Sequence, residues 1–178
     1  MLARSVFVAM IAATPIFAQA TTSASAAPSA TSQLKKAWEH ERENIMDAAV
    51  EVPESIYAFR PTPDVRTFGE LIAHIAGAQD SFCAAALGEK PPAEDAVERV
   101  TKAKAALVEA LRKSNDHCAR AYSQSDADAA KLVNASDGDG PRFSTLILNT
   151  THDSEHYGNI VTYMRMNKMV PPSSKPRK

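Results

Sequence analysis

Thr150-Thr-His-Asp-Ser-Glu-His-Tyr-Gly-Asn-Ile-Val-Thr-Tyr-Met-Arg165 is the stretch that decides the expected fold. His152 and His156 are four residues apart, so in a helix both imidazoles leave the same face. Two such rings can bind one transition-metal ion, because zinc–nitrogen bonds are only about 2.0–2.1 Å long. The alternative is a pair of polar residues on a half-buried helix. Apolar or packable residues recur at helical spacing along this segment: Leu148, His152, His156, Ile160, Tyr163 and Met164.

The first twenty residues, Met1–Ala20, have the pattern of a Sec signal peptide. A short charged region carries Arg4, Ser5–Phe17 is almost wholly apolar, and Ala18-Gln-Ala20 supplies a small-x-small cleavage pattern. An N-terminal membrane anchor is the alternative. We therefore expect a periplasmic or secreted protein, in which residues 21–33, rich in Ala, Ser and Thr, form a disordered leader.

Charge and hydropathy exclude several partner classes. The formal net charge is −1, and it becomes −2 when Arg4 is removed with the signal peptide. Nothing in this balance indicates binding to nucleic acid. No later segment approaches eighteen consecutive apolar residues, so stable membrane insertion is not expected either. The expected partner is a small-molecule substrate, and a homodimer remains open.

The 145 residues from Leu34 onward are enough for one domain with a real core. Strand signals are nearly absent, whereas helical patterns are plentiful. Thr67 and Glu70 form a capping box at the start of one helix, and Ser144 can cap another. We predict an all-α four-helix bundle over residues 34–173 with a disordered tail at 174–178. The expected helices are 34–50, 67–87, about 93 or 98 to 122, and 144 to shortly before Pro171.

A third histidine falls on the inward face of the second predicted helix. His74 lies there among apolar residues, where an unpaired ring nitrogen would be costly. Bundles build metal sites from inward residues on facing helices, so His74, His152 and His156 form a candidate three-histidine site. Three protein ligands leave a position for water or substrate, as in catalytic zinc sites. Zinc is the favoured divalent metal by availability, with nickel or iron as alternatives.

Three stretches of the chain resemble the DinB/YfiT-like metalloenzymes. They are Arg66-Thr-Phe-Gly-Glu-Leu-Ile-Ala-His-Ile-Ala76, His152-Asp-Ser-Glu-His-Tyr-Gly158, and the ending from Tyr163-Met-Arg165 to Pro171-Pro-Ser173. The resemblance runs from about Leu34 to Ser173. It implies that the three matching histidines bind a divalent metal inside a four-helix bundle. Some relatives use this metal to activate a low-molecular-weight thiol for transfer or isomerisation.

The reaction itself is open between classes. Export weakens the thiol-transferase interpretation, because bacillithiol and mycothiol are used in the cytosol, and metal-assisted hydrolysis gains by comparison. Glu155, Asp153 and His40 are the candidates for a general base, and none is convincing. The main alternative is a non-catalytic bundle that carries metal or binds a partner.

A protease is a further alternative, and the sequence argues against it. His152-Asp-Ser-Glu-His156 also fits a His-x-x-Glu-His protease pattern. Such a protease needs an acidic ligand downstream, and no Asp or Glu follows His156.

On the third predicted helix, the Lys and Glu residues of the outer face are expected to form a solvated surface without a functional role.

The two cysteines connect the expected compartment to the topology. An even count in an exported protein favours one disulfide, with two buried thiols as the alternative. If the third helix turned back directly after Pro92, Cys83 and Cys118 would lie at very different depths in the bundle. If instead residues 88–97 cross the length of the bundle, the second and third helices run parallel and the depths nearly match. We therefore predict a Cys83–Cys118 bridge and a long crossover between helices two and three.

Overall fold

The computed structural model describes residues 27–135 and 138–176. The predicted signal peptide and residues 21–26 of the predicted leader lie outside this range. Within it, no helix combines the length and apolar character needed to cross a bilayer. Four long helices form the body of the molecule: α1 (Ala30–Glu51), α2 (Phe68–Leu87), α4 (Lys104–Ala121) and α6 (Arg142–Met166).

Shorter elements connect these helices. A 3₁₀ turn, η1 (Glu54–Ile56), follows α1, and η2 (Pro172–Ser174) follows α6. The remaining elements are α3 (Ala96–Val100), α5 (Asp126–Ala129), β1 (Leu132–Ala135) and β2 (Gly138–Pro141), of which the two strands pair antiparallel.

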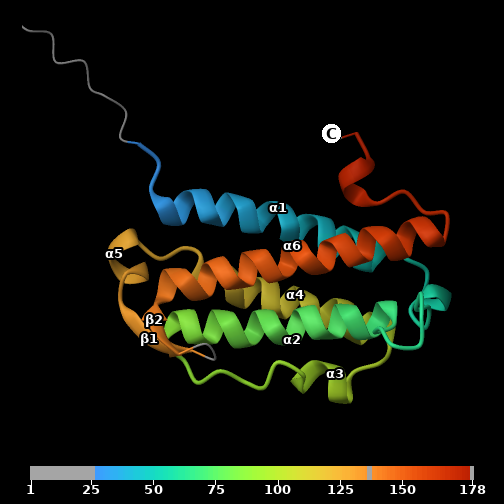
Figure 1. Ribbon diagram of the computed structural model, residues 1–178, viewed down its shortest axis with the longest axis horizontal. Helices are drawn as coiled ribbons and strands as arrows, with labels where there is room; N and C mark the ends of the chain where they lie inside the picture. The colour runs from blue at the N-terminus through green and yellow to red at the C-terminus, as the bar shows by residue number, and fades with distance from the viewer. Residues whose placement is uncertain (1–26, 136–137, 177–178) are drawn as a thin grey trace, which may run out of the picture.

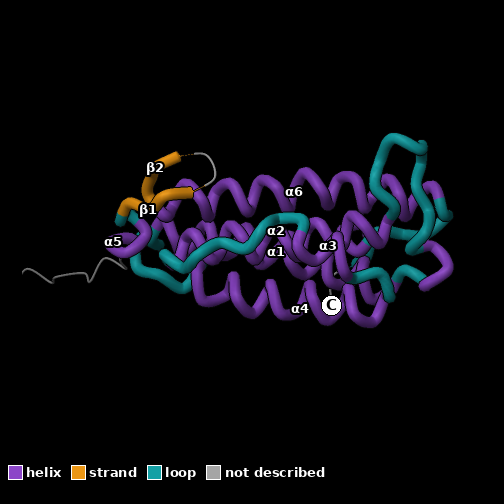
Figure 2. The backbone as a smooth tube through the Cα atoms, turned by 90° about the horizontal axis from the view of Figure 1, so that it is seen from below, coloured by secondary structure: helices purple, strands orange, loops and turns teal. Residues whose placement is uncertain are grey.

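The four long helices form the predicted bundle with the predicted long crossover. Helices α1 and α6 run in one direction, and α2 and α4 run in the other (Figure 1). After α2 ends, the chain returns along the outside of the bundle through α3 before α4 begins (Figure 2). Helices α2 and α4 are therefore neighbours that run parallel, which a short connection could not produce.

Helix α2 is buried along nearly its whole length and contacts α4, α6 and the crossover helix α3. It begins at the predicted capping box, in which the Thr67 side chain accepts from the Glu70 backbone and Glu70 accepts from the Thr67 backbone. Its apolar residues join those of α1, α4 and α6 in one large core cluster. Because α2 contacts both α4 and α6, a residue on its α6 side faces the His-x-x-x-His segment.

The crossover lies very close to α2 at Gly77. A Cβ atom on Gly77 would be 2.0 Å from the Glu94 carbonyl oxygen, far inside van der Waals contact. Only glycine therefore allows the crossover backbone to approach α2 this closely. This contact fixes α3 beside the part of α2 that carries His74.

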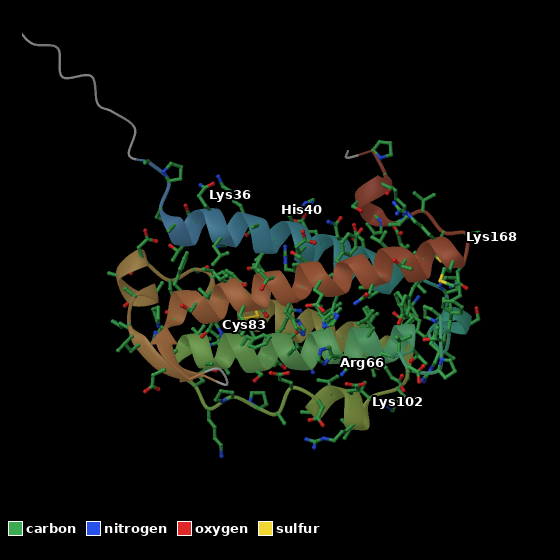
Figure 3. All side chains as sticks on the ribbon, in the orientation of Figure 1. Lys36, His40, Arg66, Cys83, Lys102 and Lys168 are labelled. Carbon is green, nitrogen blue, oxygen red and sulfur yellow. A yellow bond between two sulfur atoms is a disulfide. The ribbon has the colours of Figure 1, made fainter. Side chains whose placement is uncertain are left out.

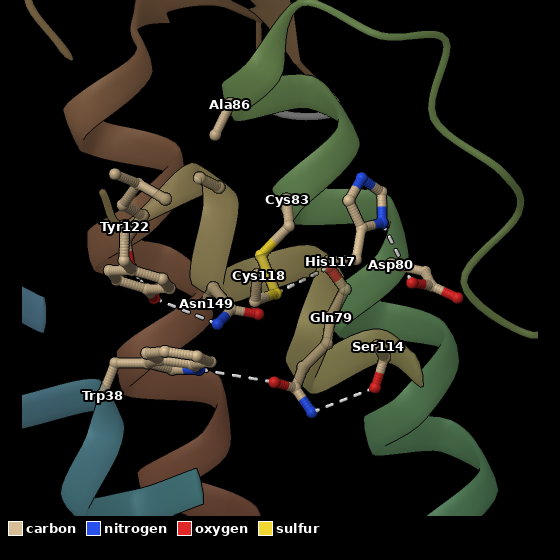
Figure 4. The surroundings of a disulfide bond; sticks show 12 residues. Trp38, Gln79, Asp80, Cys83, Ala86, Ser114, His117, Cys118, Tyr122 and Asn149 are labelled. Carbon is tan, nitrogen blue, oxygen red and sulfur yellow. Dashed lines mark hydrogen bonds and ion pairs between the residues drawn. A yellow bond between two sulfur atoms is a disulfide. The ribbon is translucent and has the colours of Figure 1, made fainter. Parts of the chain in front are cut away.

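A disulfide joins the parallel helices. Cys83 of α2 and Cys118 of α4 are bonded, with their Cα atoms 5.1 Å apart (Figure 4). Both residues are fully buried in a second apolar cluster. In this cluster the Trp38 ring stacks on Tyr122, with ring centroids 4.5 Å apart. The two bonded cysteines therefore lie at the same level along two parallel helices, as predicted for a bundle with a long crossover.

Three predicted helix boundaries differ from the structure. Helix α1 begins at Ala30, inside the stretch predicted to be disordered, because the Ser29 side chain caps it by accepting from the Ser32 backbone. The expected helix from residue 93 or 98 to 122 is two helices, since Thr101 takes an extended conformation between α3 and α4. Helix α6 begins after Pro141, and Ser144 does not cap it.

The connection before α6 contains strands that were not predicted. Strand signals are nearly absent from the sequence, but β1 and β2 pair from Leu132 opposite Pro141 to Ala135 opposite Gly138. Near the C-terminus, Lys175 of the predicted disordered tail forms an ion pair with Glu51.

Candidate metal centre

His74, His152 and His156 meet between α2 and α6. The Nε2 atom of His152 lies 3.1 Å from Nε2 of His74 and 3.0 Å from Nε2 of His156. One ring nitrogen from each residue fits within a group whose members are all within 4.8 Å of one another. The structure therefore brings together all three predicted histidines, with their Nε2 atoms pointing toward a common centre.

The spacing of these nitrogens suits a shared metal ion. Two nitrogens bound to one ion at about 2.0–2.1 Å, with an angle between 90° and the tetrahedral value, lie about 2.8–3.4 Å apart. The observed 3.0 and 3.1 Å separations fall in this range. If all three rings carry their proton on Nδ1, the three Nε2 lone pairs converge and repel one another, and a cation at the centre removes that repulsion. The donor set therefore fits a divalent transition metal.

Burial keeps these imidazoles neutral at ordinary pH. It is the main cause that lowers the pKa of His74 to about 4, and the Arg66 guanidinium lowers it further. The pKa of His156 is also lowered to about 4, first by burial and then by His152. Burial likewise lowers the pKa of His152. Neutral imidazole is the form that binds metal, so the rings are in the ligating state without prior loss of a proton.

The outer ring nitrogens face polar groups from three places. His74 Nδ1 lies 4.0 Å from Oε2 of Glu98 on α3, and His152 Nδ1 lies 3.9 Å from Oδ1 of Asp153. The Asn159 amide lies 3.3 Å from Nδ1 of His156. The nitrogen Nδ2 is the amide atom that faces Nδ1, so in this geometry the amide donates to the ring. A 180° flip of the amide would let its oxygen accept from Nδ1–H and would leave Nε2 free as a ligand.

A cavity of about 450 Å³ opens beside His156. Tyr163 donates to the Arg66 backbone carbonyl at 2.8 Å, which fixes Arg66 immediately before the α2 capping box. The Arg66 guanidinium, at Nε, donates to Oε1 of Glu98 at 3.0 Å. The side chain of Arg66 remains 41 % exposed and lines the cavity, so a small polar molecule there would touch a cation and His156.

The three predicted base candidates have different positions. Asp153 is fully buried beside His152, and burial raises the pKa of its carboxyl well above the usual range. Glu155 is exposed on α6. His40 lies on α1, on the opposite side of the molecule from Arg66 (Figure 3). It lines a separate cavity with Glu43, Asn44 and Asp47, and is not part of the histidine cluster.

Glu98 and Arg66 are the site residues that the sequence did not reveal. The charged residues of the third predicted helix were expected to be a solvated surface, and for Glu98 that expectation is wrong. Its side chain is 21 % exposed, pairs with Arg66 and faces His74. Arg66 immediately precedes the capping box, and this adjacency was the available signal for its position.

Comparison with known proteins identifies the family. The profile of the DinB superfamily matches residues 37–160. The chain belongs to the DinB superfamily. A sequence comparison with curated proteins gave no match.

Solved structures share the DinB fold at low sequence identity. A DinB-like protein from Bacillus cereus ATCC 10987 has 17% identity and a TM-score of 0.67, over 78% of this chain and 93% of that one. A mycothiol-dependent maleylpyruvate isomerase has 17% identity and a TM-score of 0.63, over 73% of this chain and 60% of that one. YfiT from Bacillus subtilis, described as a probable metal-dependent hydrolase with an unusual four-helix bundle topology, has 13% identity and a TM-score of 0.62, over 82% and 93%.

Proposed function

We propose that this DinB protein is an exported, metal-dependent hydrolase of a small polar substrate. His74, His152 and His156 would hold one divalent ion, with zinc favoured and nickel or iron as alternatives. The observation that carries the proposal is the convergence of three neutral Nε2 atoms, at 3.0 and 3.1 Å, beside an open cavity. Such a set uses three protein ligands and leaves room for water and substrate.

A bound ion in such a site supplies Lewis acidity and lowers the pKa of a water molecule toward about 7. Residues of this chain would bind the ion and hold the substrate. The three imidazoles bind without releasing protons, because burial already keeps them neutral. Arg66 offers its guanidinium at the cavity wall, where it can hold an anionic group of the substrate. Phe82 packs against His152 in an edge-to-face arrangement, with ring centroids 5.5 Å apart.

Thiol transfer is the second candidate, and the fold of the mycothiol-dependent isomerase favours it. The signal-peptide pattern of Met1–Ala20 argues against it, because low-molecular-weight thiol cofactors of this kind work in the cytosol. The Cys83–Cys118 disulfide supports export as well, since disulfides persist in oxidising compartments. Cell fractionation and the mass of the mature N-terminus test this location, with cleavage after Ala20 expected.

The test of activity uses the full mature chain loaded with zinc. Wild type and His74→Ala are assayed against a panel of small esters, amides and phosphoesters, and in a thiol-transfer assay. Hydrolysis that is lost in His74→Ala but kept in His40→Ala supports the proposal, because His40 lies outside the cluster. Thiol transfer without hydrolysis supports the second candidate. Full zinc loading without turnover of any substrate favours a bundle that only carries metal or binds a partner.

A further inference from the structure

Two acidic side chains, the buried Asp153 and the half-buried Glu98, lie next to the histidine cluster. In the first, the Asn149 amide donates to Oδ2 of Asp153 at 3.4 Å, and Oδ1 of Asp153 lies 3.9 Å from Nδ1 of His152. In the second, the Arg66 guanidinium donates to Oε1 of Glu98, and Oε2 of Glu98 lies 4.0 Å from Nδ1 of His74. Each carboxylate thus has one oxygen held by another residue and its second oxygen near the outer nitrogen of a candidate ligand.

Three of the four facing atoms are buried and have no hydrogen-bond partner among the described residues. These atoms are Nδ1 of His74, Nδ1 of His152 and Oδ1 of Asp153. A hydrogen bond needs a separation of about 2.7–3.2 Å, so each gap is roughly 1 Å too long. Small rotations of the ring and the carboxylate close a gap of this size. Buried polar atoms without partners are rare, and their placement opposite each other indicates a pair that forms in another state of the site.

We propose that Asp153 and Glu98 are positioning residues that hold His152 and His74 as metal ligands. This inference rests on the proposed metal binding. When Nδ1–H donates to a carboxylate, the ring tautomer is fixed and the Nε2 lone pair is presented to the ion. The two carboxylates satisfy the outer nitrogens, and the ion satisfies the inner ones.

The two positioning residues come from different parts of the fold. Asp153 belongs to α6 and is fully buried next to its histidine. Glu98 belongs to α3, which reaches the site only because the crossover passes close over Gly77. The crossover helix therefore forms part of the metal centre and does more than connect α2 to α4.

The test measures metal affinity and does not need a substrate. Mature wild-type protein, Asp153→Asn and Glu98→Gln are titrated with zinc in competition with a chromophoric chelator, and the cobalt-loaded forms are compared by their visible absorption. Each substitution keeps the side-chain volume and removes the carboxylate. We expect each to weaken zinc binding about 10- to 100-fold. The melting temperature of the metal-free Glu98→Gln protein should stay close to wild type, because Glu98 is near the surface.

Glu155→Gln is the matched control. Glu155 is an exposed carboxylate on the same helix as two of the histidines, so this variant reports the effect of nearby charge alone. Its zinc affinity should stay within about threefold of wild type. If Glu98→Gln binds zinc as tightly as wild type, the inference is overturned even if Asp153→Asn fails to fold. An equal loss in Glu155→Gln also overturns it. Wild type that binds no zinc overturns the proposed function and this inference together, whereas tight binding by wild type and all variants overturns the inference only.

Discussion

Removal of the Cys83–Cys118 bridge should destabilise the protein by an amount set by loop length. The two cysteines are 35 residues apart, and closing a loop of this size costs the unfolded chain about 13 cal/mol/K of entropy, or about 4 kcal/mol at 25 °C. In the folded protein the bridge adds little restriction, because it joins two helices that already lie side by side. Its stabilising effect therefore comes from the unfolded state. For a protein of this size, about 4 kcal/mol corresponds to a fall in Tm of roughly 8–16 °C.

The assay is urea unfolding of wild type and Cys83→Ala/Cys118→Ala, each with and without reductant. Alanine is used because both positions are fully buried, and a serine hydroxyl there would lack a partner. Reductant should lower the unfolding midpoint of wild type toward that of the double variant and leave the double variant unchanged. Equal stability of oxidised wild type and the double variant, or two free thiols in the exported wild-type protein, would refute the reasoning.

Two further predictions concern the crossover and the histidines. Gly77→Ala should lower the free energy of unfolding by about 1–3 kcal/mol, because the new Cβ would meet the Glu94 carbonyl oxygen. Gly158→Ala in α6, with open space around its Cβ, should be neutral or stabilising, and equal Tm changes for the two variants would contradict this account. The metal-free protein should also lose stability as the pH falls from about 6.5 to about 4. His74 and His156 have folded-state pKa values of about 4, so the unfolded chain takes up protons first in this window. Urea midpoints that do not change between pH 7 and pH 5 would contradict it.

The sequence was sufficient for the parts of the fold that local patterns determine. Helical spacing of apolar residues placed the four main helices, and the Thr67–Glu70 capping box is present as expected. The prediction that His74 faces His152 followed from their positions among the inward-facing apolar residues of two helices in a bundle. The crossover followed from the depths of the two cysteines, because a disulfide relates positions that periodicity alone cannot.

The missed features depend on contacts between distant segments. Glu98 has the sequence context of a solvated helix face, and only the path of the crossover over Gly77 brings it to Arg66 and His74. The break at Thr101 contains no Gly or Pro, so local propensity gave no reason to divide α3 from α4. In each case tertiary packing decided a conformation that the local sequence left open.

Metal content measured on the mature protein, purified without a histidine tag, is the most direct test of the central claim. Elemental analysis should find close to one divalent ion per chain in wild type and in His40→Ala. In His152→Ala it should find almost none, while the helical circular dichroism spectrum stays largely unchanged. Full metal content in His152→Ala, or a wild-type protein that takes up no ion from excess zinc at pH 7.5, would contradict the assignment of His74, His152 and His156 as a metal centre.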